Sequence, residues 1–170
     1  MTLYNCLYKY RNEKGTTMIE LLLYMAIFSL FLLVLTDIFS QVIDVELESQ
    51  GISNVEEDGK FIALRLTHDI QSASAITAPA NPGDTSGSLQ LAVNGVNYTY
   101  SINSNNLVLT EGATTAQLNG YSTTISTLTF KRLGNTGGKN AITVNFTVTD
   151  AAQRVAGQAK NSYQVTASMR

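Results

Sequence analysis

The feature that most constrains this chain is a run of apolar residues near its N-terminus. Leu21–Leu35 contains fifteen residues without a charged side chain. The wider segment Met18–Phe39 has 22 residues with charges only near its two ends, and as a helix it would extend for about 33 Å. A helix needs about 20 largely apolar residues to cross a bilayer. The sequence therefore predicts one membrane-spanning helix.

Charge is distributed unevenly on the two sides of this run. Before it stand Lys9, Arg11 and Lys14 against Glu13, whereas the chain after it is acidic as far as Asp58. Basic residues that flank a membrane span remain on the cytoplasmic side. We therefore expect a single-pass protein of the cytoplasmic membrane whose C-terminal part lies outside the cytoplasm. The net charge of −2 argues against general nucleic-acid binding.

Two ordinary interpretations of the apolar run are open. A cleaved secretory signal peptide needs small residues at a cleavage site after the run, and Thr36–Ser40 offers a poor one. An uncleaved signal anchor fits the basic N-terminus. Neither explains Glu20, because a charged group at a membrane span is costly and is usually paired. If the chain were cut after Gly15, the new α-amino group of Thr16 would lie four residues from Glu20 and could neutralise it.

The segment Lys14–Leu22 (KGTTMIELL) resembles the processing site of type IV prepilins and of the pseudopilins of type II secretion and competence systems. These proteins share a short basic leader that ends in Gly, followed by an aromatic residue, Thr, two aliphatic residues, Glu and an apolar helix. Gly15, Thr17 and Glu20 match this pattern in type and spacing, whereas Thr16 stands where the family usually has Phe. The resemblance implies that prepilin peptidase cuts between Gly15 and Thr16 and that Thr16 is N-methylated. It also implies that Glu20 pairs with the terminal amine of Thr16 during subunit assembly.

The helix is expected to continue beyond the membrane to about residue 77. Apolar residues recur there at three- and four-residue spacing, which is typical of an amphipathic helix that packs on a core. Gly51 and Gly59 lie in this stretch, and we expect local bending or a break because glycine destabilises a helix. Pro79 and Pro82 end the segment. The stripe consists of Ile38, Val42, Val45, Ile52, Val55, Ile62, Leu66, Ile70 and Ala73.

The segment Arg65–Ala73 (RLTHDIQSA) resembles a stretch of the W-type minor pilins and the J-type minor pseudopilins. This resemblance implies a minor subunit at or near the tip of a filament. The residues alone predict an Arg65–Asp69 pair on the helix surface, worth about 0.2–0.5 kcal/mol. His68 has no partner in the sequence for catalysis or metal binding, and we expect it on the surface or partly packed.

From residue 89 onward the period of the apolar residues changes to two, which is typical of strands with one buried face. Asn94-Gly95 predicts a hairpin turn, and Asn103–Asn106 predicts a second one. The whole pattern predicts an α+β, pilin-like fold in which a long N-terminal helix covers an antiparallel sheet. The expected strands are 89–93, 96–102, 107–110, 125–131, 141–149 and 163–169.

The sequence offers no constellation for catalysis, for a metal ion or for a cofactor. It contains no recognised nucleophile, zinc or nucleotide-binding motif. Its single cysteine, Cys6, cannot form an internal disulfide. Asn81, Asp84 and Asp150 do not have the spacing of a calcium-ligand set. We therefore expect no enzymatic activity, no cofactor and no metal.

One basic group remains to be explained in the C-terminal half. Lys131, Arg132 and Lys139 could form a small patch of the kind that a DNA-capturing pilin uses to bind phosphates. Three charges without neighbouring aromatic residues are more typical of a solvated loop. Nucleic acid is therefore not an expected partner.

These observations divide the chain into three parts. Residues 1–15 are expected to be a prepilin leader, residues 16–40 the membrane and filament-core half of the helix, and residues 41–170 a globular pilin-like domain. The expected function is that of a minor pilin or pseudopilin, processed by prepilin peptidase. It would assemble with other pilin or pseudopilin subunits into a type IV pilus, a competence pilus or a type II secretion pseudopilus. The alternative is a signal-anchored extracytoplasmic β-domain that binds a ligand or surface and does not polymerise.

Overall fold

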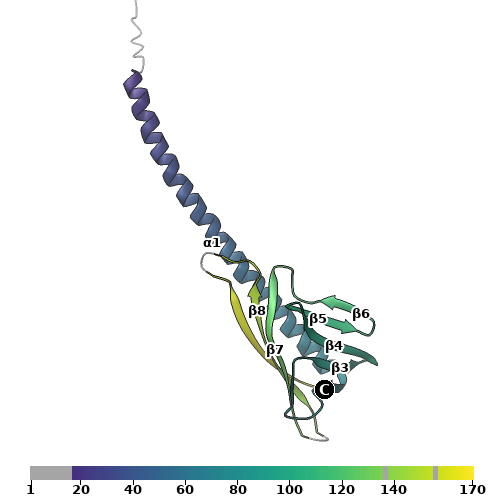
Figure 1. Cartoon of the computed structure of the whole chain (residues 1–170). Helices are drawn as coiled ribbons and strands as arrows, with labels where there is room; N and C mark the ends of the chain where they lie inside the picture. The colour runs from purple at the N-terminus through teal and green to yellow at the C-terminus, as the bar shows by residue number, and fades with distance from the viewer. Residues whose placement is uncertain (1–16, 136–137, 155–156) are drawn as a thin grey trace, which may run out of the picture. The chain divides into compact units, whose positions relative to one another are not determined.

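The structure, a computed structural model, describes residues 17–135, 138–154 and 157–170. The expected leader, with Gly15 and Thr16, lies outside these residues. The chain divides into two compact units between Ile43 and Asp44. Nine strands and one helix make up the described elements (Figure 1).

The helix α1 (Met18–Ser72) begins at a threonine cap. Thr17 Oγ1 accepts a hydrogen bond from the backbone N–H of Glu20 at 3.3 Å. The carbonyl of Thr17 accepts the first helical bond, from Leu21 N at 3.0 Å. A threonine in this position satisfies a donor that a helix N-terminus otherwise leaves unpaired.

The expected end of the helix near residue 77 was wrong by five residues. α1 ends at Ser72, and Ala73–Ala78 forms the edge strand β1. Ala73 pairs with Val93 and Ile76 with Leu91, so that the segment forms backbone hydrogen bonds with β3 (Leu89–Val93). Ala73 and Ile76 also become buried there. Strand pairing and burial together override the helical spacing that the sequence shows.

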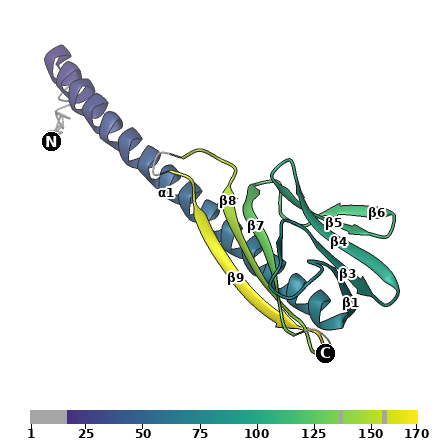
Figure 2. The same cartoon turned by 60° about the horizontal axis from the view of Figure 1, so that its bottom comes forward.

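The strands form two antiparallel sheets where the sequence predicted one (Figure 2). The predicted strands are all present, and the sequence missed β1, β2 and β6. The first sheet has the order β1-β3-β4-β5-β6, with β3 (Leu89–Val93), β4 (Val96–Asn103), β5 (Asn106–Glu111) and β6 (Thr114–Gln117). The second has the order β2-β7-β8-β9, with β2 (Thr85–Ser86), β7 (Thr123–Leu133), β8 (Ala141–Asp150) and β9 (Lys160–Ser168).

Both predicted hairpin turns are confirmed. Asn94 and Gly95 have φ of 50° and 80°, and they join β3 to β4. Ser104 and Asn105 have φ of 50° and 64°, and they join β4 to β5. Two consecutive positive φ values match the right-handed twist of the flanking strands, which is why such turns connect hairpins. The predicted α+β fold, a long N-terminal helix with antiparallel strands, is confirmed as well.

The core of the second unit lies between α1 and the strands. The apolar stripe predicted along the helix is buried only from Val55 onward, whereas Ile38, Val42, Val45 and Ile52 are exposed. The buried helix residues form one hydrophobic cluster with buried residues of both sheets. The largest of these buried side chains are Ile62, Leu66, Ile70, Leu89, Leu91, Tyr100, Leu107, Ile125, Phe130, Ile142 and Phe146.

No break occurs at Gly51 or Gly59, because α1 is continuous through both residues. Both glycines are sites of close approach instead. A Cβ atom on Gly59 would lie 2.1 Å from Cζ of Tyr163, and one on Gly51 would lie 2.5 Å from an oxygen of Asp150. The hydroxyl of Tyr163 donates to the carbonyl of Val55 at 3.2 Å. Glycine therefore allows β9 to contact the helix backbone.

We expect Gly59→Ala to lower the free energy of unfolding by about 1–3 kcal/mol, because the added methyl group overlaps the Tyr163 ring. Urea unfolding of the full chain in detergent measures this, with Gly87→Ala as the control. A Cβ on Gly87 meets no heavy atom within 4 Å. Equal midpoints for the two variants would show that the ring moves away at no cost.

Candidate assembly site at the start of the apolar helix

The first turns of α1 bring three polar residues together at one end of the apolar segment. Thr17 caps the helix through the backbone of Glu20, as described above. The side chain of Glu20 is held separately, because the Tyr24 hydroxyl donates to its Oε1 at 2.9 Å. Neither of these side-chain contacts to Glu20 was predicted from the sequence. Glu20 and Tyr24 are four residues apart, and this spacing places two side chains on the same face of a helix. It is the signal from which the Tyr24–Glu20 contact could have been predicted.

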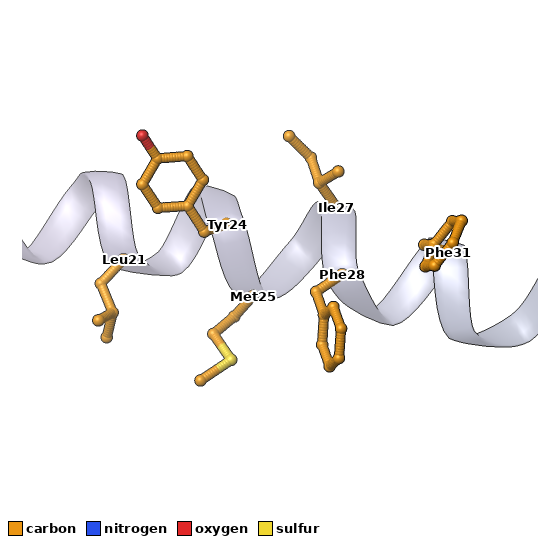
Figure 3. A pocket seen from close by; sticks show the side chains of 6 residues that line it. All are labelled: Leu21, Tyr24, Met25, Ile27, Phe28 and Phe31. Atoms are coloured by element: carbon orange, nitrogen blue, oxygen red, sulfur yellow. The ribbon is translucent and has the colours of Figure 1, made fainter.

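The residues after Glu20 present an apolar surface. A shallow hollow on the helix is lined by Leu21, Tyr24, Met25, Ile27, Phe28 and Phe31 (Figure 3). The hydroxyl of Tyr24 is the one oxygen-bearing group among these side chains. Each of them is about half exposed, as are the other large apolar residues as far as Phe39. α1 is long and apolar enough in this part to cross a membrane.

What this arrangement can do follows from its composition. An apolar surface of this size is stable in a bilayer or against other apolar helices, and it is unstable in water. Glu20 is the charged group at the N-terminal end of this surface, and it must enter such surroundings or remain at their edge. Gly15 and Thr16, the predicted cleavage and methylation positions, lie outside the described residues, so the pairing of Glu20 with the Thr16 amine stays a prediction.

A second polar group, which the sequence analysis placed on the surface, is buried. The side chain of Asp69 is 3% exposed, and it accepts hydrogen bonds from Arg65 Nε at 2.8 Å and from the hydroxyl of Tyr100 in β4. His68 Nδ1 lies 3.1 Å from its other oxygen, while the His68 side chain itself is 77% exposed, as expected. Asp69 therefore links the end of α1 to the first sheet. Asp69 lies three residues after buried Leu66, on the same face of the helix. This spacing is the signal from which its burial could have been predicted.

The environment of Tyr100 favours its neutral form. Burial raises the pKa of Tyr100 well above its ordinary value, and the hydrogen bond to Asp69 raises it further. The bond to Asp69 likewise raises the pKa of Arg65, which keeps that guanidinium charged. The Tyr100 hydroxyl keeps its proton and donates it to the buried carboxylate of Asp69. This hydrogen bond joins the helix to the first sheet.

A third group fixes the loop between β6 and β7. Asp58 of α1 accepts hydrogen bonds from Gly120 N at 2.8 Å and from the Thr123 hydroxyl. The buried side chain of Asn119 accepts from Leu107 N at 2.8 Å and donates to the carbonyl of Thr123 at 2.7 Å. This group could not be predicted from the sequence, because its partners are up to 65 residues apart.

One of the three basic residues of the candidate patch, Arg132, is bound to the protein's own backbone. Arg132 donates from one terminal nitrogen to the carbonyls of Ile76, Pro79 and Ala80, at 3.3, 3.0 and 2.6 Å. Lys131 and Lys139 are exposed, whereas Arg132 is partly buried. The guanidinium therefore ties β7 to the end of β1. This is a structural role that sequence spacing could not show.

Within the described residues, no group of three His, Cys, Asp or Glu side chains could hold a metal ion. One long apolar N-terminal helix with antiparallel sheets gives the chain the general form of a pilin. Comparison with models of known families, with curated protein sequences and with solved structures gives no significant match.

We expect Tyr100→Phe to remove part of the alkaline loss of stability. A tyrosine whose pKa is raised by folding contributes stability below the unfolded value of about 10, and that contribution is lost as the pH rises above it. Wild-type protein should therefore lose free energy of unfolding between about pH 9 and 11 more steeply than the variant. Urea unfolding across this range measures the difference. Tyr121→Phe is the control, since Tyr121 is 99% exposed, and parallel curves for all three proteins would contradict the account.

Proposed function

We propose that this chain is a minor pilin or pseudopilin subunit. It is inserted in the cytoplasmic membrane, cut by prepilin peptidase between Gly15 and Thr16, and assembled with other subunits into a pilus or pseudopilus. The observation that carries the proposal is the first half of α1, whose apolar side chains are exposed from Met18 to Phe39 and which carries Glu20 at its start. The resemblance of Lys14–Leu22 to a prepilin processing site supports the same conclusion.

The mechanism is assembly and not catalysis. In the precursor, the bilayer covers the apolar half of α1. After cleavage, apolar helices of neighbouring subunits cover it in the core of the filament, where dry surroundings strengthen electrostatic pairing. Glu20 then pairs with the terminal amine of Thr16 of a neighbour. The stretch Arg65–Ala73, which resembles minor subunits, supports a position at or near the filament tip.

The processing step has a direct test. Co-expression with a prepilin peptidase should shorten the chain by residues 1–15, and a Gly15→Asp variant should keep its full mass, because the peptidase needs the small residue before the cut. Intact-mass spectrometry measures both products. An additional methyl mass on the shortened chain, located on the N-terminal residue by fragmentation, would show that Thr16 is methylated. A full-length mass in both samples would favour the uncleaved signal anchor, and the filament proposal would be wrong.

The role of Glu20 has a separate test. We expect Glu20→Ala to be cleaved normally but to enter filaments at about a tenth of the wild-type level or less, which corresponds to the loss of one charge-assisted bond. Glu46→Ala is the matched control, because Glu46 is an exposed carboxylate of the same helix beyond the apolar segment. Quantitative immunoblotting of filament and membrane fractions gives the ratio. Normal incorporation of Glu20→Ala would exclude the pairing.

A further inference from the structure

The hydroxyl of Tyr24 is directed at Glu20, which distinguishes it from the other hydroxyl groups of the apolar segment. Ser29 Oγ and Thr36 Oγ1 donate to main-chain carbonyls of the preceding turn, at 2.8 and 2.9 Å. Tyr24 donates to Oε1 of the Glu20 side chain, at 2.9 Å. Helical side chains lean toward the N-terminus, so a residue reaches back over the preceding turn. In Figure 3 the Tyr24 ring is displaced along the helix axis toward the end at which Leu21 lies, although the two side chains point to opposite sides of the helix.

The chemical value of this contact depends on where Glu20 resides. A carboxylate in water has many donors, and an exposed hydrogen bond to it contributes little. At a membrane span or in a filament core water is scarce, and a hydrogen bond to an ionised carboxylate is roughly twice as strong as a neutral one. The carboxylate has two oxygens, and Tyr24 engages Oε1. The second oxygen, Oε2, is then the acceptor for a second donor.

We propose that Tyr24 is a positioning residue for Glu20. Its hydroxyl stabilises the carboxylate in the precursor, before cleavage creates the terminal amine, and it holds the side chain so that Oε2 receives the amine of a neighbouring subunit. The second step rests on the proposed function, whereas the first needs only insertion of the helix. The carboxylate thus has one partner on its own helix and one from the next subunit.

The ordinary role of a tyrosine near the end of a membrane helix is to anchor it at the interface between lipid and water. That role concerns the ring and the lipid headgroups, and it is independent of Glu20. A positioning role predicts that the two residues are coupled. The effects of changing them should therefore be non-additive, whereas an anchor would give additive effects.

The contact can be tested on the uncleaved full chain in lipid vesicles. The infrared difference between the chain and its Glu20→Gln variant isolates the Glu20 carboxyl band. The same difference is then measured with Tyr24→Phe in both proteins. The Glu20 band should shift in frequency, because the carboxylate has lost the hydrogen bond from the Tyr24 hydroxyl. Tyr121→Phe, which removes an exposed hydroxyl from the second unit, should leave the band in place. An unchanged band in Tyr24→Phe would overturn the inference.

The positioning role is tested by incorporation into filaments. Tyr24→Phe should be cleaved normally and incorporated about tenfold less than wild type, and it should have no further effect in the Glu20→Ala background. A shifted band together with wild-type incorporation would overturn the positioning role. If the wild-type chain itself is neither cleaved nor incorporated, the proposed function fails and the positioning role fails with it. The infrared band then still decides the contact within the helix.

Discussion

The apolar half of α1 sets the main constraint on this protein. Its large apolar side chains between Met18 and Phe39 are about half exposed or more. Such a surface must be covered by lipid or by other apolar helices. The function of the chain must therefore place this surface in apolar surroundings. In the proposed function these surroundings are first the membrane and then the filament core. The carboxylate of Glu20 needs a hydrogen-bond or charge partner in either of these surroundings.

The second unit depends on close contact between the other half of the same helix and two sheets. Gly59 allows Tyr163 to reach the helix backbone, and Gly51 does the same for Asp150. Two carboxylates of the helix also join it to the strands: buried Asp69 is bonded to Tyr100 of β4, and partly buried Asp58 is bonded to the β6–β7 loop. The second unit is thus joined by close contacts and by carboxylates that accept hydrogen bonds from the strands and loops.

Periodicity predicted most of the fold, because helices and strands with one buried face repeat their apolar residues at different intervals. It located the apolar helix and six strands, and the turn-forming residues between strands located two hairpin turns. It failed where a residue depends on distant partners: the strand at Ala73–Ala78, the two helical glycines and buried Asp69. Of the candidate site, the sequence identified Glu20 through its spacing from Gly15, but it could not show that Tyr24 contacts the carboxylate. A contact of this kind depends on side-chain direction as well as spacing.

The central claim is that protein replaces lipid around the apolar half of α1 after processing. Photo-crosslinking from a benzoylphenylalanine in place of Phe28, in cells that contain a prepilin peptidase, tests it most directly. The account predicts covalent adducts with other apolar-helix subunits, and it predicts that these disappear when Gly15 is replaced by Asp. Lipid adducts alone, identical with and without that replacement, would contradict it and leave the chain as a membrane-anchored domain.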